Sequence, residues 1–249
     1  MEGQDKDLRD WDSRTRRLTG DDGAERLRRA RVLVVGTGGV GGYAVEMLVR
    51  SGIEHLTLVD SDTVDVSNLN RQILALIPVL GKPKTEVAAR RCREINPQAE
   101  ITSLQTLVTP DNIAEILDPG FDYVLDCIDT VAPKAALICA CRDRRIPIIS
   151  SMGAGGRTDP SRVIYTDLWE TKDDGLARAV RQKLKKMNRR FPLPVVASTE
   201  RPGSHSIIEV DAQFKRTSYG TLAPVPATFG IFMAARVINH ILNNTHFKK

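Results

Sequence analysis

The chain has 249 residues, of which 41% are hydrophobic and 27% are charged, a composition typical of a globular protein with a buried core. No apolar run approaches the roughly 20 residues that a membrane span needs, so membrane insertion is not expected, and the first residues lack the apolar core of a secretory signal. The net charge of +5 permits an anionic partner without requiring one.

The first 150 residues alternate short apolar runs with helical stretches. The apolar runs are rich in β-branched residues and predict buried parallel strands at 31–35, 55–59, 100–104, 123–128 and 146–150. Helices are predicted between them, at 43–50, 83–95, 111–117 and 132–144. This alternation predicts an α/β fold of the Rossmann-like, doubly wound type with a mostly parallel sheet.

The final 100 residues or so change character. They predict a strand at 163–168, a charged helix at 171–190 and an apolar helix at 227–242 that packs on the sheet. Residues 190–203 are rich in proline and polar side chains and predict a loop. Because no linker is visible, we expect a single domain over residues 1–249, with a C-terminal extension packed on the sheet.

A glycine-rich turn, GTGGVG at residues 36–41, follows the first predicted strand and opens a helix. Glycines let the backbone approach phosphate oxygens closely, and the helix N-terminus supplies N–H donors. Asp60 ends the second predicted strand, 19 residues after Gly41, where a carboxylate can bind ribose hydroxyls. The pattern predicts an adenine-nucleotide site, but this motif alone does not separate NAD from ATP.

Charged residues soon after Asp60 favour ATP over NAD. Arg71 lies in SNLNRQ at 67–72, and Lys84 lies in GKPK at 81–84. An adenylating enzyme must stabilise charge on the α-phosphate and on the departing pyrophosphate, and these two cations are suited to that task. Asp126 and Asp129 lie at the end of the fourth predicted strand, where one of them can hold Mg²⁺.

Taken together, GTGGVGG, Asp60, NLNRQ, GKPK and DCID resemble the nucleotide site of the ubiquitin-activating-enzyme-like superfamily, which includes the ThiF and MoeB types. The resemblance covers roughly residues 14–160, the expected nucleotide-binding core within residues 1–160. It implies that ATP and Mg²⁺ are bound by Gly36, Gly38, Gly39, Gly41, Asp60, Asn68, Arg71, Lys84 and Asp129, with Asp129 as the metal ligand. It also implies a homodimer, in which an N-terminal arginine reaches the neighbouring subunit's ATP; Arg17 matches best, although Arg14 or Arg16 could serve.

The cysteines indicate which branch of the superfamily the chain resembles. Paired CxxC motifs, usual in ThiF- and MoeB-type enzymes, are absent from the four cysteines, which are Cys92, Cys127, Cys139 and Cys141. Their apolar surroundings predict buried, reduced thiols and a cytoplasmic setting. The chain is similar instead to tRNA threonylcarbamoyladenosine dehydratases, through VTPDN at 108–112, DCIDTVAPKAALI at 126–138, GAGGRTDP at 153–160 and PATFG at 226–230.

This second resemblance implies an ATP-dependent dehydration, in which a carboxylate of the modified adenosine is adenylated and then attacked by an atom of the same residue. A well-aligned intramolecular nucleophile has an effective concentration on the order of 10⁵ M or more, so no enzyme thiol is required. Residues 161–249 would then face the substrate and its tRNA. The segment at 190–195 departs from the family by being short, which leaves substrate contacts there open, and a sulfur-relay protein is allowed as a further partner.

The tRNA requires positive charge on the protein. Residues 172–190 carry eight basic and two acidic side chains, and we expect Lys183, Lys185, Lys186 and Arg189 to contact nucleic acid. The alternative for this segment is a solvated helix face. For the whole protein the alternatives are an adenylyltransferase that activates the C-terminus of a ubiquitin-like sulfur-carrier protein, an NAD-dependent oxidoreductase and a non-catalytic nucleotide-sensing module.

Overall fold

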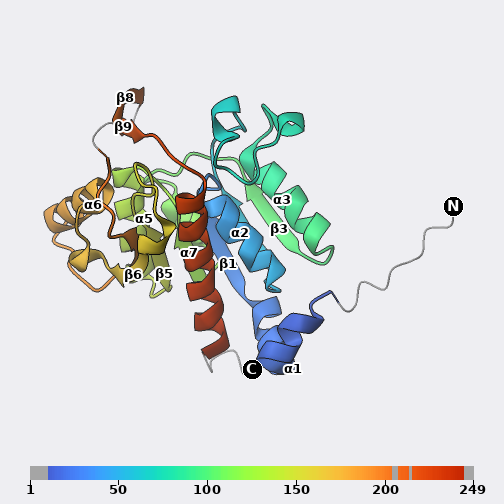
Figure 1. Ribbon diagram of the computed structural model, residues 1–249. Coiled ribbons are helices and arrows are strands. Elements are labelled where there is room, and N and C mark those ends of the chain that lie inside the picture. Colours follow the sequence, from blue (N-terminus) through green and yellow to red (C-terminus); the bar gives the residue numbers. More distant parts are fainter. Residues whose placement is uncertain (1–10, 204–206, 213–214, 244–249) are drawn as a thin grey trace.

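The computed structural model describes residues 11–203, 207–212 and 215–243. A seven-stranded sheet crosses the molecule in the order β3-β2-β1-β4-β5-β7-β6 (Figure 1). Its strands are β1 (Arg31–Val35), β2 (His55–Val59), β3 (Glu100–Leu104), β4 (Tyr123–Asp126), β5 (Ile148–Ser151), β6 (Val163–Asp167) and β7 (Pro194–Ser198). All neighbouring strands are parallel except β6, which pairs antiparallel with β7 at the sheet edge.

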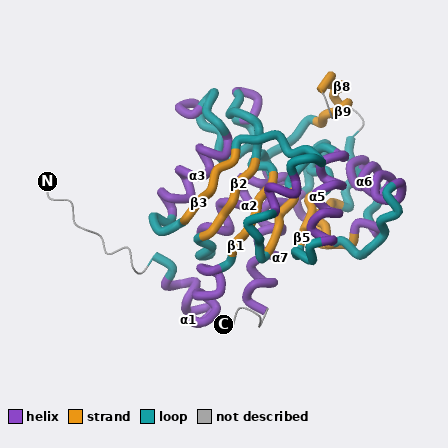
Figure 2. Tube along the Cα trace, turned by 180° about the vertical axis from the view of Figure 1, so that it is seen from behind, coloured by secondary structure: helices purple, strands orange, loops and turns teal. Residues whose placement is uncertain are grey.

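Helices cover both faces of the sheet, as the views from the front and from behind show (Figures 1 and 2). They are α1 (Ser13–Arg29), α2 (Gly41–Arg50), α3 (Lys84–Ile95), α4 (Ile113–Leu117), α5 (Val131–Asp143), α6 (Gly175–Lys186) and α7 (Pro224–Asn243). One apolar cluster joins the sheet to α1, α2, α3 and α7, and a second joins it to α4, α5 and α6. The predicted doubly wound α/β class is therefore confirmed.

The central strands β1 and β4 are buried on both faces, which explains their apolar sequences RVLVV and YVL. In β1, the side chains of residues 32–35 are at most 1% exposed. Val34 is paired with Leu58 of β2 on one side and with Leu125 of β4 on the other. Strand β1 therefore lies in the interior of the sheet, between β2 and β4, and the glycine-rich turn follows directly after it.

The predicted loop at 190–203 was wrong, because it contains β7. This strand lies between β5 and β6, and residues 195–198 are buried. Pro192 and Pro194 concealed the strand signal, yet Pro194 occupies the first position of the strand, where proline is tolerated. The charged helix is also shorter than predicted, because the Asp174 side chain accepts a hydrogen bond from Ala177 N and caps α6 at its start.

A hairpin of β8 (Ile207–Ala212) and β9 (Lys215–Tyr219) lies outside the main sheet and had no counterpart in the sequence-based prediction. The short 3₁₀ helices are Val66–Asn68, Ile77–Val79, Pro160–Arg162 and Leu168–Glu170. The first two belong to the crossover segment, residues 61–83, that leads from β2 to α3.

Helix α7 closes the described chain and packs closely on α2. Among the described residues, α7 is the helix whose length and apolar composition would suffice to cross a membrane. The expectation that no apolar segment approaches that length is therefore corrected. Its buried residues, including Phe229, Met233 and Val237, belong to the core cluster that covers the sheet. Its apolar character is therefore accounted for by packing against α2 and the sheet.

Candidate functional site

The glycine-rich turn forms a tight backbone loop between β1 and α2. Gly36 has φ +91°, a conformation that favours glycine, and its N–H donates to Val59 O at 2.7 Å. A Cβ atom on Gly41 would lie 1.8 Å from Gly36 O, and one on Gly36 would lie 2.9 Å from Cys127 O. The loop can therefore adopt this shape only with glycine at these two positions, and it leaves the start of α2 open to an anion.

Asp60, at the end of β2, holds this loop in place. One carboxylate oxygen accepts hydrogen bonds from Thr37 N at 2.6 Å and from Thr37 Oγ1 at 3.1 Å. The other accepts from Asp62 N at 2.9 Å. Asp60 thus connects the carboxyl ends of two neighbouring strands and lines the same pocket as the glycines.

The crossover segment brings the predicted cations to that pocket. Lys84, the first residue of α3, is only 5% exposed, and its Nζ lies 2.7 Å from Asp62 Oδ2. Asn68 is buried and forms a reciprocal capping pair with Asp65, whose pKa is lowered chiefly by hydrogen bonds from Ser67. Arg71 Nη1 donates to Ser67 O at 2.7 Å. These contacts fix Asn68, Arg71 and Lys84 around one cavity of about 720 Å³.

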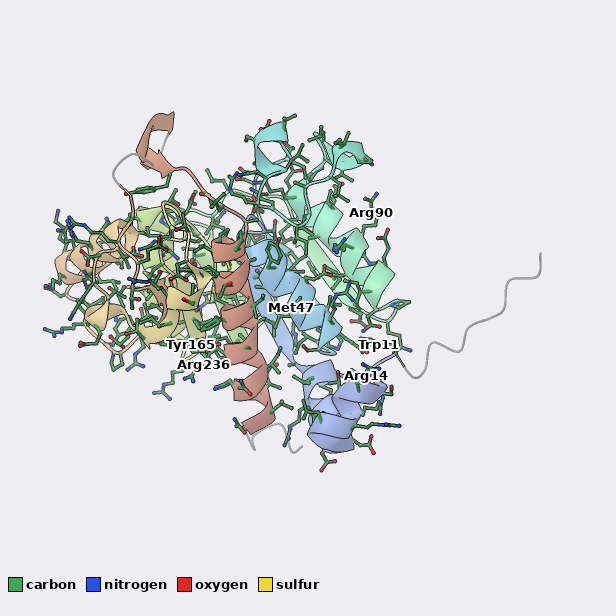
Figure 3. All side chains as sticks on the ribbon, viewed as in Figure 1. Trp11, Arg14, Met47, Arg90, Tyr165 and Arg236 are labelled. Atoms are coloured by element: carbon green, nitrogen blue, oxygen red, sulfur yellow. The ribbon has the colours of Figure 1, made fainter. Side chains whose placement is uncertain are left out.

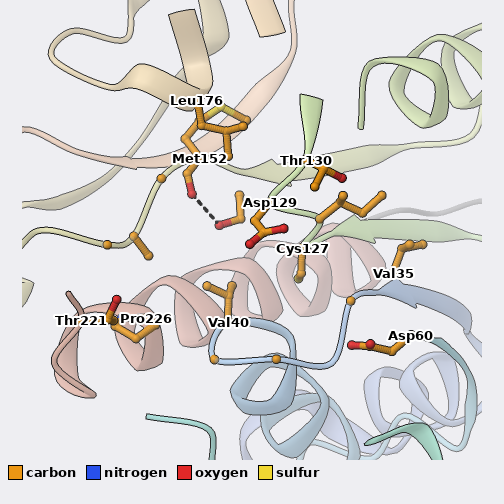
Figure 4. Close-up of a pocket in the computed structure, with 18 of the residues that line it drawn as sticks. Val35, Val40, Asp60, Cys127, Asp129, Thr130, Met152, Leu176, Thr221 and Pro226 are labelled. Atoms are coloured by element: carbon orange, nitrogen blue, oxygen red, sulfur yellow. Dashed lines mark hydrogen bonds between the residues drawn. The ribbon is translucent and has the colours of Figure 1, made fainter. Parts of the chain in front are cut away.

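The two aspartates after β4 have different environments. Asp129 is exposed and lines the pocket across from Asp60 (Figure 4). Asp126 is fully buried and does not line the pocket. The structure therefore makes Asp129, rather than Asp126, the carboxylate that can reach a bound metal or nucleotide.

Asp126 instead belongs to a buried polar cluster below the pocket that sequence reasoning missed. Lys134 of α5 is 0% exposed and places its Nζ 2.7 Å from Asp126 Oδ2 and 3.0 Å from Ser150 Oγ. Ser150 Oγ donates to Asp126 Oδ2 at 2.6 Å, and Ile128 N donates to Asp126 Oδ1 at 3.1 Å. The cluster ties β4, β5 and α5 together three residues before Asp129. A lysine within the apolar run VAPKAALICAC was the available signal.

The far side of the pocket is built by residues 153–157 and the start of α6. Arg157 is 2% exposed; its Nη2 lies 3.2 Å from Asp174 Oδ2, its Nε donates to Glu200 O at 2.9 Å, and Nη1 donates to Gly153 O. Asp174 also accepts from Gly153 N at 3.0 Å. Arg157 therefore joins the loop after β5, the start of α6 and the end of β7, and it was not among the predicted site residues.

The cysteines are unsuited to nucleophilic chemistry. Burial raises the pKa of Cys92 and of Cys141 to about 12, and it also raises the pKa values of Cys127 and Cys139. Cys127 lines the pocket, but its Sγ lies 3.9 Å from Met233 Sδ in apolar surroundings. Because the thiolate is the reactive form, raised pKa values make these thiols poor nucleophiles at neutral pH.

Two sets of predicted residues lie away from the pocket. Arg17 is exposed on α1, and Figure 3 shows Arg14 of the same helix at the end of the molecule opposite the β8–β9 hairpin. Lys183, Lys185 and Lys186 are exposed near the end of α6. Arg189 follows α6 and forms two hydrogen bonds with Asp143, at 2.8 and 2.9 Å.

No group of three or more His, Cys, Asp or Glu side chains that could hold a metal ion is found in the described ranges. A metal in this pocket would therefore need oxygen ligands from a bound nucleotide beside Asp129. That arrangement suits Mg²⁺, which is commonly held by one or two carboxylates together with substrate phosphates.

Comparison with known proteins agrees with this geometry. The ThiF family model matches residues 12–249. The tRNA threonylcarbamoyladenosine dehydratase of Haemophilus influenzae is 39% identical over 237 residues, 91% of each chain. The crystal structure of the Escherichia coli tRNA N6-threonylcarbamoyladenosine dehydratase in complex with ATP superimposes with a TM-score of 0.86 at 38% identity, covering 94% of each chain.

A molybdopterin-synthase adenylyltransferase from Haemophilus influenzae is also 39% identical, but over only 145 residues, 58% of each chain. The likeness to the dehydratases thus extends beyond the nucleotide-binding core into the residues that complete the far side of the pocket. The chain belongs to the ThiF family and, within it, to the tRNA threonylcarbamoyladenosine dehydratases.

Proposed function

We propose that this protein is an ATP-dependent tRNA threonylcarbamoyladenosine dehydratase. The observation that carries the proposal is a single pocket that combines the glycine loop, Asn68, Arg71, Lys84 and Asp129 with a second wall formed by residues 153–157 and the start of α6. The first wall carries the backbone N–H groups and cations that would bind ATP. The cavity of about 720 Å³ continues to the second wall, where we place the second reactant. The full-length likeness to dehydratases supports the choice of that reactant.

In the proposed reaction, a carboxylate oxygen of the threonyl group attacks the α-phosphorus of ATP and displaces pyrophosphate. The urea-type group of the same side chain then attacks the activated carbonyl carbon, the C–O bond to AMP breaks, and a proton is released. The original carboxylate oxygen leaves with AMP, so the nucleoside loses the elements of water. No enzyme thiol takes part, in agreement with the raised pKa values of the cysteines.

The chain's own residues would hold ATP and stabilise the developing charge. The N–H groups at the start of α2 would face the phosphates, and Asp60 would bind the ribose hydroxyls. Arg71 and Lys84 line the same pocket, where their positive charge would lower the energy of the pentavalent phosphorus and of the departing pyrophosphate. Asp129 would hold Mg²⁺, which when bound neutralises phosphate charge.

We further propose a homodimer in which Arg17 enters the partner's pocket. Within one chain Arg17 is not among the residues that line the pocket. Its neighbour Leu18 is 87% exposed, and the crossover segment beside the pocket exposes Val66 at 65% and Ile77 at 74%. Apolar side chains so exposed on both elements fit an interface in which α1 of one copy covers the crossover segment of the other. The sulfur-relay partner and the cytoplasmic location stay predictions from the sequence.

Nucleoside mass spectrometry tests the activity. The protein is incubated with ATP, Mg²⁺ and tRNA that carries threonylcarbamoyladenosine, and the nucleosides are analysed after digestion. We expect a product lighter by one water, with one AMP formed per product and no product with Lys84→Ala. If the nucleoside is unchanged and a ubiquitin-like carrier protein with a C-terminal Gly-Gly is adenylated instead, the dehydratase assignment fails in favour of the adenylyltransferase alternative.

A further inference from the structure

The ends of α5 and α6 gather basic side chains from separate parts of the sequence. Residues 142–145 and 183–191 contain eight Lys or Arg and one acidic residue, a net charge of +7 against +5 for the whole chain. Helices α5 and α6 pack side by side, and the hydrogen bonds between Arg189 and Asp143 join their ends. We call this surface the α5–α6 basic patch; its exposed members include Arg142, Arg145, Lys183, Lys185, Lys186 and Arg190.

Two aromatic rings support the cations of this patch. The Trp169 ring lies 5.2 Å from the Arg190 guanidinium and 6.0 Å from Lys185 Nζ, and the Phe191 ring lies 5.3 Å from the guanidinium of Arg142. Trp169 Nε1 donates to the backbone carbonyl oxygen of Phe191 at 2.8 Å, which ties the Trp169 ring to the segment that carries Phe191. Because cationic side chains cover these rings, the ring faces are not free to stack on bases. The patch therefore offers positive charges whose positions are fixed by the rings.

The patch lies about one helix length from the pocket. Both helices begin beside the pocket, at Val131 and Gly175, and run away from it. Helices of 13 and 12 residues span about 20 and 18 Å. A polyanion with one nucleoside in the pocket would have to extend over that distance to reach the patch.

We propose that the α5–α6 basic patch binds the phosphate backbone of a double-helical RNA stem, part of the tRNA whose nucleoside reacts in the pocket. We choose a double-helical stem rather than a single strand because the patch offers positive charges and no free aromatic ring faces. Duplex RNA is recognised through phosphates and shape, whereas single strands are bound largely by stacking on aromatic rings. The proposal rests on the proposed function for the identity of the tRNA, and it adds the arginines that end α5 to the basic residues of α6.

The test compares two variants that remove the same charge. The patch variant carries Arg145→Gln, Lys183→Gln and Lys186→Gln, all exposed positions. The matched control carries Arg50→Gln, Arg90→Gln and Arg93→Gln, exposed positions on α2 and α3. Binding of a fluorescent RNA stem–loop and of a single strand of equal length is measured by anisotropy, between about 50 and about 200 mM salt. Turnover of modified tRNA is measured in parallel.

We expect the slope of log affinity against log salt to fall by about 2 to 3 for the stem–loop in the patch variant. Across that fourfold change in salt, the wild type then loses about 30-fold more affinity than the variant. The salt slope for the single strand should fall less than that for the stem–loop, and the affinity for ATP should be unchanged. In the turnover assay, the KM for tRNA should rise while kcat is preserved.

An unchanged slope in the patch variant, or an equal loss in the matched control, would overturn the proposal. Failure of the proposed function would give a different result in the turnover assay: the wild type would bind the stem–loop but form no cyclised nucleoside. A slope loss in the patch variant under those conditions would still support an RNA-binding surface.

Discussion

Replacing Lys134 by methionine would leave the Asp126 carboxylate in the core without its cation. Both side chains are 0% exposed, and the Nζ–Oδ2 distance is 2.7 Å. Removing one partner of a buried ion pair typically costs about 3 to 5 kcal/mol, because the remaining charge keeps its desolvation penalty. Ser150 Oγ and Ile128 N still donate to Asp126. We therefore expect the free energy of unfolding to fall by about 3 kcal/mol, the lower end of that range.

For a chain of this size, about 3 kcal/mol corresponds to a fall in Tm of roughly 6 to 12 °C. Urea unfolding followed by circular dichroism measures the free energy directly, and Lys172→Met, at an exposed position, is the matched control, expected to change it by less than about 0.5 kcal/mol. The double variant Lys134→Met with Asp126→Leu removes both charges and should recover most of the loss.

A Lys134→Met variant within about 1 kcal/mol of the wild type would refute this reasoning, as would a double variant no more stable than the single one. Either result would mean that the two charges are solvated or separated in solution. A second readout concerns the site: because Asp126 lies three residues before Asp129, the single variant should need more Mg²⁺ for half-maximal activity.

The remaining predictions concern the site itself. Asp129→Ala should fold normally and turn over at least about 100-fold more slowly, measured as AMP release; near-wild-type turnover would remove Asp129 from the metal site. Gly41→Ala should abolish ATP binding in calorimetry, since its Cβ would meet Gly36 O at 1.8 Å; normal affinity would mean that the loop differs in solution. Mixing inactive Arg17→Ala and Lys84→Ala subunits should restore part of the activity, and no recovery in verified mixed dimers would argue against a shared site. The thiols should resist alkylation at pH 8, and a folded variant should stay active with Ala at Cys92, Cys127, Cys139 and Cys141; loss of activity would point to covalent thiol chemistry.

The sequence was most informative where one physical requirement decides the local structure. Strands β1, β2 and β3 have the predicted bounds. The signal is clearest in β1, because a strand buried on both faces must be a continuous apolar run. The glycine loop was equally clear, since a Cβ at Gly36 or Gly41 would clash with the backbone beside it. By contrast, β7 was missed because its prolines are typical of loops, and only the neighbouring strands show that Val195 and Val196 are interior.

Side-chain roles in the site depended on contacts between distant residues. Asp126 and Asp129 are equivalent as sequence signals, and it is Lys134 and Ser150 that divide them into a buried anchor and a pocket carboxylate. Arg157 has a similar dependence, because its partners Asp174 and Glu200 become neighbours only after the sheet forms. The basic residues at 183–189 were recognisable as a charged set, but their joining with Arg142 and Arg145 follows from the packing of α5 on α6.

The close packing of α7 behind the glycine loop bears on how the protein is made on the ribosome. Gly230 approaches so closely that a Cβ there would lie 2.3 Å from Val40 O, inside the loop. The loop is synthesised early, whereas α7 begins at Pro224, so at about 5 to 20 residues per second the loop waits roughly 10 to 40 seconds for its supporting helix. During that interval the nascent chain carries the glycine motif without the packing that shapes it. We therefore expect a nascent chain to bind ATP only after α7 has been synthesised and has packed on the loop.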